Sequence, residues 1–199
     1  KFTGNLQQVP FSKDNSVLSS ITDSEITSNV IRPTYLSGYG SISNCTINWR
    51  EVTGNWDFDN VSVYSSHIQM QSSDSKRTID ITNSRFSYCQ EGLSLFRYSN
   101  VNIQNVNFTE CFSSDSGGAL YIISSGDVDI GQTIFSSNTA ASMGGAVYLK
   151  CDTDYSNMNV NIADSVFEGN HANEGGAVAC TGPVALDSGD SVFTENTSA

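Results

Sequence analysis

A short motif recurs along the chain and constrains its fold more than any other feature. Gly-Gly-Ala occurs three times, at residues 117–119, 144–146 and 175–177. Each copy follows an aromatic residue that has Cys or Asn three positions later. These pairs are Phe108/Cys111, Phe135/Asn138 and Phe167/Asn170, and Phe193/Asn196 begins a further unit. Self-similarity at a period of about 20 to 50 residues indicates a solenoid, in which each repeat buries its apolar face only against its neighbours.

An apolar-polar-apolar triplet precedes each Phe at a fixed distance. The triplets begin at Trp56, Ile79, Val101, Val128 and Val160. In the last unit the triplet 184–186 lies farther from Phe193, which predicts a longer loop there. With Ile42 interpreted as a worn copy, the anchor residues of successive units are Ile42, Val63, Phe86, Phe108, Phe135, Phe167 and Phe193. They are separated by 21, 23, 22, 27, 32 and 26 residues.

Each unit contains three short alternating segments: the triplet, the pair that ends in Phe, and the segment after Gly-Gly-Ala. The pattern therefore predicts an all-β fold, a right-handed single-stranded parallel β-helix of about seven coils with three short strands per coil. Equivalent Phe, Ile and Val side chains should stack inside, about 4.8 Å apart. A β-sandwich is the alternative, which the common phase of the motifs disfavours. Residues 1–34 fit poorly and are expected to form an N-terminal cap or arm, and 35–199 the β-helix domain with an incomplete last coil.

Phe-x-x-Asn alternating with Gly-Gly-Ala followed by Val or Leu resembles the repeat of the chlamydial polymorphic membrane proteins and of similar microbial surface β-helices. The resemblance covers residues 79–199 well and 35–78 only through their periodicity. It implies a surface-exposed or secreted chain that serves in adhesion or as a structural spine.

The polar residue of the Phe-x-x-Asn motif should fall on the same corner of every coil. Asn138, Asn170 and Asn196 are expected to form an internal amide ladder that satisfies buried backbone groups. Cys45, Cys89 and Cys111 are assigned to the same corner. One rung of spacing lies within the range that a disulfide tolerates, so the disulfide candidates are Cys89 with Cys111 and, with a two-residue shift in register, Cys151 with Cys180. Reduced thiols buried as small apolar groups are the alternative.

The middle residues of the triplets should form one line on an outer strand face. They are Asp57, Asp80, Asn102, Asp129 and Asn161, and the line is expected to end at Ala185. Carboxylates and amides at rung spacing are oxygen ligands that could bind calcium or a sugar, although a solvated polar face is the simpler interpretation. No Lys or Arg is expected in this line, so no catalytic residues are assigned and the chain is not expected to be an enzyme. His67 and His171 lie too far apart along the stack to share a metal.

Charge and composition exclude several partners. Nine Lys and Arg against 21 Asp and Glu give a net charge of −12, which disfavours binding to nucleic acid and to anionic lipid. No apolar run approaches the roughly 20 residues of a membrane-spanning helix. The chain does not begin with Met, so we expect a processed or excised chain. Asn-x-Ser/Thr motifs make Asn44, Asn60 and Asn107 glycosylation candidates, with Asn107 expected to point outward and Asn60 to lie in a loop.

These features together predict an extracellular or cell-surface protein. The first hypothesis is a structural or adhesive β-helix that assembles head to tail through its solenoid ends, with surface glycans or host and matrix proteins as partners. The alternative is a carbohydrate-binding or polysaccharide-processing β-helix with an acidic, calcium-binding outer face. A cofactor is expected only in that alternative, as calcium.

Overall fold

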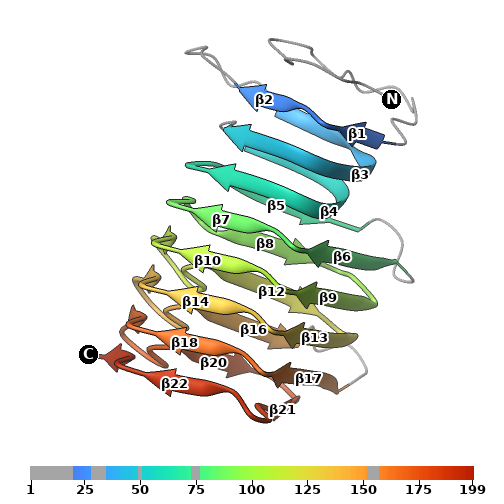
Figure 1. Cartoon of the computed structure of the whole chain (residues 1–199). Coiled ribbons are helices and arrows are strands. Elements are labelled where there is room, and N and C mark those ends of the chain that lie inside the picture. The colour runs from blue at the N-terminus through green and yellow to red at the C-terminus, as the bar shows by residue number, and fades with distance from the viewer. Residues whose placement is uncertain (1–19, 28–34, 49–50, 73–76, 152–156) are drawn as a thin grey trace.

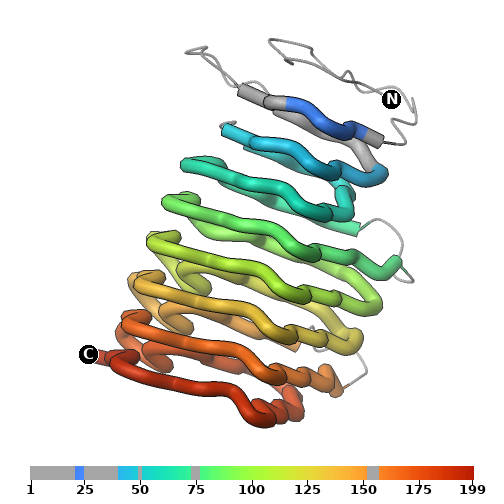
Figure 2. Tube along the Cα trace, in the orientation of Figure 1, coloured from blue at the N-terminus to red at the C-terminus, as the bar shows by residue number. Residues whose placement is uncertain are grey.

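The computed structural model describes residues 20–27, 35–48, 51–72, 77–151 and 157–199. These residues form strands and turns without a helix, and every pairing between their named strands is parallel. Figure 1 shows the strands stacked in tiers from the N-terminal to the C-terminal end, and Figure 2 shows successive turns of the chain lying one beside the next. The chain is therefore a parallel β-solenoid, as its repeat predicts.

Three rows of strands run along the stack. The first row contains β6 (Thr78–Thr82), β9 (Asn100–Gln104), β13 (Asp127–Gly131), β17 (Met158–Ala163) and β21 (Val184–Asp187). The second row contains β7 (Arg85–Ser87), β10 (Asn107–Thr109), β14 (Ile134–Ser136), β18 (Val166–Glu168) and β22 (Val192–Thr194). The third row contains β5 (His67–Gln71), β8 (Leu93–Phe96), β12 (Leu120–Ser124), β16 (Val147–Cys151) and β20 (Val178–Thr181). A four-stranded sheet between the second and third rows contains β11 (Phe112–Ser113), β15 (Thr139–Ala140), β19 (His171–Ala172) and β23 (Thr197–Ser198).

The N-terminal coils use longer strands. β3 (Tyr35–Asn48) pairs along most of its length with β4 (Glu51–Tyr64). On its other side β4 pairs with β5, β6 and β7 of the next coil. β1 (Ser20–Thr22) and β2 (Glu25–Thr27) pair in register with β3. The segment 1–34, expected to be a cap or arm, thus contributes two strands to the parallel stack, while 1–19 and 28–34 lie outside the described residues.

The predicted interior column of phenylalanines is confirmed. Phe108 pairs with Phe135 and Phe135 with Phe167, and all three side chains are buried. The ring centroids of neighbouring members are 5.1 and 4.6 Å apart, with nearly parallel planes. Offset stacking at this spacing adds to the burial of each ring, because a rung and a stacked ring pair have almost the same repeat distance.

The alignment of the repeats that the sequence suggests is wrong in register at two places. Ile42 pairs with Phe58 and not with Val63, whose partner is Ile47. The pairs Ile42/Ile47 and Phe58/Val63 have the same spacing, and this coil lacks the Gly-Gly-Ala turn and is correspondingly short. Cys45 consequently pairs with Val61 and is not at the corner that Cys89 and Cys111 occupy.

The second misalignment is at the last unit. Leu186 pairs with Val160, and Phe193 pairs with Phe167. The separation in sequence from Leu186 to Phe193 therefore equals that from Val160 to Phe167, and the predicted longer loop is absent. Asn161 therefore faces Asp187, whereas the predicted partner Ala185 faces Asn159. The physical reason is that Val184 and Leu186 lie opposite the buried Met158 and Val160, two positions earlier than the triplets of the other coils, and β21 ends before the position equivalent to Ile162.

The turn between the first and second rows uses a left-handed backbone conformation in every coil. Its φ angles are 51° at Asn44, 53° at Asn60, 49° at Asn83 and 55° at Asn105. Asn tolerates this conformation because its short side chain bonds locally. The side chains also bond along the stack, since Asn105 Nδ2 donates to Asn83 Oδ1 over 2.9 Å. Asn recurs at this turn for both reasons.

Gln132 occupies the same turn with φ at 50° and an exposed side chain. Its longer side chain lacks the local bond that compensates Asn, so we expect Gln132→Asn to raise the free energy of unfolding by about 0.5–1 kcal/mol. Chemical denaturation at neutral pH measures the change. Gln104→Asn, in the neighbouring β9 where φ is not positive, is the control and should bring no gain. Equal or lower stability of Gln132→Asn would contradict this account.

The two glycines of each Gly-Gly-Ala motif have different roles. Gly144 has φ at 65°, a left-handed conformation in which a side chain is strained. At Gly145 a Cβ atom would overlap the carbonyl oxygen of Gly176 in the next coil. The first glycine therefore permits the turn, and the second permits the close approach of adjacent coils.

Candidate functional site

The outer face of the first row carries the predicted line of acids and amides. Asp80 pairs with Asn102, Asn102 with Asp129, and Asp129 with Asn161, at successive rungs. Asn102 Nδ2 donates to Asp80 Oδ1 over 2.8 Å, and Asn161 Nδ2 donates to Asp129 Oδ1 over 3.4 Å. Each carboxylate thus retains an oxygen that faces solvent. The line ends at Asp187, which adds a carboxylate that the sequence alignment had placed elsewhere.

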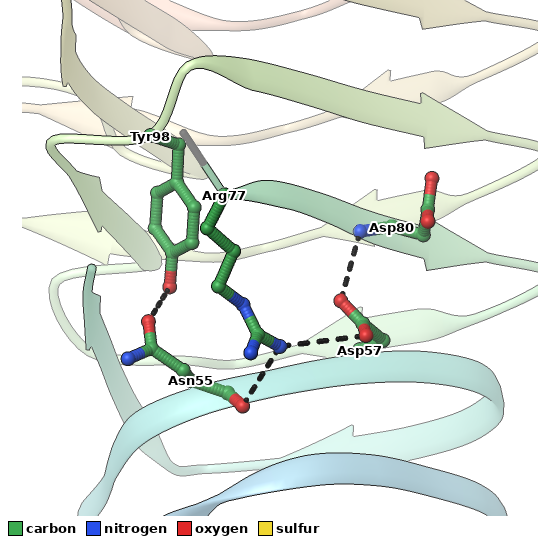
Figure 3. A network of polar contacts seen from close by, with 5 residues as sticks. All are labelled: Asn55, Asp57, Arg77, Asp80 and Tyr98. Atoms are coloured by element: carbon green, nitrogen blue, oxygen red, sulfur yellow. Dashed lines mark hydrogen bonds and ion pairs between the residues drawn. The ribbon is translucent and has the colours of Figure 1, made fainter. Parts of the chain in front are cut away.

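Asp57 begins this line inside a polar network (Figure 3). Its Oδ2 lies 3.4 Å from the Arg77 guanidinium, and its Oδ1 accepts a hydrogen bond of 3.2 Å from the backbone N–H of Asp80. Arg77 also donates to the Asn55 carbonyl over 3.1 Å, and the buried Tyr98 hydroxyl donates to Asn55 Oδ1 over 2.6 Å. The network joins three coils.

Arg77 corrects the expectation that no cation accompanies this line. It precedes β6 directly and reaches back across one rung to Asp57, so its side chain lies on the line although its backbone does not. Spacing within a strand cannot reveal such a reach. The only sequence signal is a cation at the entry of the strand that follows the aspartate by one coil.

Two aspartates in neighbouring positions have pKa values shifted in opposite directions. Burial raises the pKa of Asp57 above 3.8, and this outweighs the hydrogen bond from Asp80 and the Arg77 charge. Hydrogen bonds from Asn83 and Thr82 lower the pKa of the exposed Asp59 below 3.8. Both shifts are relative to the pKa of an unperturbed aspartate, and both are caused by the surroundings of the side chain in the native fold.

We therefore expect Asp57 to titrate above 3.8 and Asp59 below it, measured by NMR of the side-chain carboxyl carbons against pH. A native state that takes up a proton before the unfolded state gains stability as pH falls, so Asp57 makes stability decrease as pH rises through its folded pKa. Asp59 has the opposite effect, because its contribution is lost as pH falls below 3.8 towards its folded pKa. Equal midpoints or the reverse order would contradict the assignment.

A shallow groove of about 510 Å³ lies at the C-terminal end of the same face. Its lining includes Ala185, which faces Asn159 on the neighbouring rung, together with Val160 and Leu186. The polar residues along it are Asp127, Asp129, Asn159, Asn161 and Asp187. A groove bordered by carboxylates and amides can accept hydrogen bonds from, and donate them to, a hydroxylated ligand.

The described residues contain no group of three or more His, Cys, Asp or Glu placed to hold a metal ion. His171 bonds through Nδ1 to the Thr197 hydroxyl over 2.8 Å, and His67 lies on β5. The candidate calcium ligands form an extended line with one residue per rung, and the rungs of Asn102 and Asn161 carry amides in place of carboxylates, so the oxygens are spread along the stack.

The interior corner contains the amide ladder. Asn138 and Asn170 are buried completely. Asn170 Oδ1 accepts from both the backbone N–H and Nδ2 of Asn138 at 2.9 Å, and Asn196 Oδ1 accepts in the same manner from Asn170 at 3.0 and 2.8 Å. Each Nδ2 also donates to a phenylalanine carbonyl in the preceding coil, as from Asn170 to Phe135 over 3.0 Å. The ladder satisfies backbone groups that the turn would leave unpaired.

All five cysteines carry free thiols in the structure. Cys89 and Cys111 are buried neighbours. A hydrogen bond between their thiols, together with burial, raises the pKa of the Cys111 thiol. A bridge between them stays a prediction. Cys180 pairs with Leu149, two residues from Cys151, so this second pair does not lie at directly opposed positions.

The glycosylation candidates lie at different places. Asn44 and Asn60 are exposed at the turn between the first and second rows, where Asn60 Nδ2 donates to Asn44 Oδ1 over 2.8 Å. Asn107 is half-buried in β10 between Arg85 and Ile134. A glycan on Asn60 would use the nitrogen that makes this corner bond. Whether these positions are modified stays a prediction.

A family model, the Chlamydia polymorphic membrane protein repeat, matches residues 132–150 and 164–181. Two segments of the chain thus match the polymorphic membrane protein repeat. Each matched segment runs from the end of the first-row turn through Phe-x-x-Asn and Gly-Gly-Ala into the third row, so the family repeat corresponds to the larger part of one coil. The match supports a surface-associated repeat protein. No curated protein and no solved structure matches the chain significantly. In the described residues, no helix is long and apolar enough to cross a membrane.

Proposed function

We propose that the chain is an extracellular, cell-surface β-helix with a structural and adhesive role and without catalytic activity. We infer a right-handed helix of about seven coils, the usual hand for parallel crossover connections. The observation that carries the proposal is the coincidence of the polymorphic membrane protein repeat with two coils of a stack filled by continuous side-chain columns. Such a stack is a stiff support that presents repeated outer rows to a partner.

Surface location and adhesion are tested separately. Antibodies against the chain should label intact producing cells, and labelling only after permeabilisation would contradict a surface role. Beads coated with the folded chain should bind host cells or matrix proteins more than beads coated with the heat-unfolded chain. Equal binding of the two bead types would contradict adhesion through the folded surface.

Head-to-tail self-association is the finer part of the proposal. On the last described coil, Val192 and Phe193 are 51% and 44% exposed. Phe193 stacks on Phe167 at 4.6 Å through one face. Sedimentation velocity over a range of concentrations should show growing species, which Phe193→Ser should suppress. Phe112→Ser, at an exposed position on the side of the stack, is the matched control. Monomers at all concentrations, without filaments in electron micrographs, would contradict self-association.

The groove at the end of the first row favours a second function, carbohydrate binding. Asp127 and Asp129 each accept a hydrogen bond from an Asn and keep further acceptor capacity within the groove. Binding to a panel of polysaccharides, with and without calcium, should fall for Asp129→Ala and for Asp80→Ala if the whole line participates. Unchanged binding in both variants would exclude this face, and unchanged binding on calcium removal would exclude the metal.

A further inference from the structure

A second hollow, of about 270 Å³, lies on the outer side of the third row, in the middle of the chain. Its lining includes Gln69, Glu91, Ser94, Phe96, Asp115 and Tyr121. It lies on β5, β8 and β12 and the turns that lead into β8 and β12, apart from the first-row line and its groove.

The hollow arises from a change in side-chain size along one outward column. Gln69, Ser94, Tyr121 and Tyr148 occupy successive rungs of this column. Tyr148 stacks on Tyr121, with ring centroids 5.2 Å apart and an angle of 28° between the planes. On the other side of Tyr121 the neighbour is the small Ser94, so the second face of the Tyr121 ring borders the hollow.

Phe96 forms an aromatic side wall. Its ring lies 5.8 Å from Tyr121 with the planes tilted by 52°. Both rings line the same hollow and neither is fully buried. Two aromatic side chains therefore line one small cavity.

Carboxylates lie across the hollow from the rings. Glu91 accepts hydrogen bonds from the hydroxyls of Ser113 and Ser114, at 2.8 and 2.7 Å, which hold its carboxylate in place. Although burial opposes charge on Glu91, these bonds and the nearby His67 outweigh it and lower the pKa of this carboxyl. Asp115 is exposed, and its charge adds to burial and to the neighbouring Tyr148 in raising the pKa of the Tyr121 hydroxyl. The hollow thus combines aromatic faces with fixed negative charge.

We propose that this hollow binds a cationic side chain, arginine or lysine, of a protein partner. The inference rests on the proposed adhesive function and names the chemistry of the contact. A cation over an aromatic face within about 6 Å of the ring centroid is attracted by the ring, and the attraction adds to charge-assisted bonds to a carboxylate. The net charge of −12 favours approach of a basic surface.

The size of the hollow selects a side chain rather than an oligosaccharide. Cavities that enclose small-molecule ligands usually have about 300–1,000 Å³, and this hollow is below that range. An extended glycan would need the longer groove on the first row. A single guanidinium or ammonium group needs only the aromatic face and the two carboxylates.

The probe is N-acetylargininamide, and N-acetylcitrullinamide has the same shape without the charge. In NMR titrations of the intact chain, the arginine probe should shift the ring signals of Tyr121 and Phe96 in a saturable manner, and citrulline should not. Asp115→Asn and Glu91→Gln should each weaken binding at least about threefold, because each removes one charge-assisted contact. Glu168→Gln, at an exposed position on β18 of the second row, is the matched control and should bind normally.

Three outcomes would overturn the proposal: equal shifts with the citrulline probe, shifts with a methyl glycoside but not with arginine, or unchanged binding in Asp115→Asn. Because Asp115 is exposed, that variant tests the charge even if Glu91→Gln disturbs its turn. Bead adhesion of Asp115→Asn separates the two claims. Full adhesion despite lost arginine binding would overturn this hollow as the adhesive contact and leave the proposed function intact. Arginine binding without adhesion of the unaltered chain would contradict the proposed function and leave the binding site intact.

Discussion

Replacing Asn170 with alanine should lower the free energy of unfolding by about 3–5 kcal/mol, the largest effect expected from a polar substitution in this chain. The change removes the acceptor of two bonds from Asn138 and the donor of bonds to Phe135 and Asn196. The site is fully buried, so the groups left behind lose their partners without gaining water. Denaturant unfolding followed by circular dichroism measures the loss.

Asn161→Ala is the matched control. It is the same substitution in the same coil, but Asn161 is exposed and makes one long bond of 3.4 Å. We expect a change within about 0.5 kcal/mol. If the two variants lost similar stability, the ladder would not be the source of the effect, and the buried amides would be no more important than those on the surface.

Replacing Phe135 with alanine should cost about 3–5 kcal/mol, the range for buried Phe in well-packed cores. Its ring is stacked on both faces, 5.1 Å from Phe108 and 4.6 Å from Phe167. Removal therefore leaves a cavity between two rings that the flanking coils hold apart by their backbone hydrogen bonds, and this limits collapse. Thermal and denaturant unfolding measure the change.

Phe112→Ala provides the comparison for the phenylalanine column. Phe112 is 48% exposed on β11 and lies outside the column. Its truncation should cost less than about 1 kcal/mol. A large loss in Phe112→Ala, or a small one in Phe135→Ala, would show that the column does not dominate the stability of the stack.

The residues that repeat most strictly are those whose structure the sequence could predict. Phe108, Phe135 and Phe167 recur with Gly-Gly-Ala at every turn, and a solenoid is the arrangement that places such residues on neighbouring rungs. Where the motif weakens, the register prediction was wrong. Ile42 and Ile47 are equally apolar, and only the pairing with Phe58 and Val63 distinguishes them.

The candidate sites divide in the same manner. The line from Asp80 to Asn161 follows from alternation within each strand, because successive side chains point to opposite faces. Arg77 could not be placed on it, since its side chain crosses a rung to reach Asp57. The hollow beside Tyr121 could not be predicted from the sequence for a related reason. It depends on the small size of Ser94 on the neighbouring rung and on turn residues of two coils.

From its sequence alone, this protein is determined to be a parallel solenoid with stacked aromatic and amide columns, because inward positions repeat with the coil and can be buried only against their own equivalents. Only the tertiary structure decided the register of the worn coils, the partners of Asp57 and the hollow of the third row. These depend on which side chains of adjacent coils oppose each other and how far they reach, and a one-dimensional pattern specifies neither.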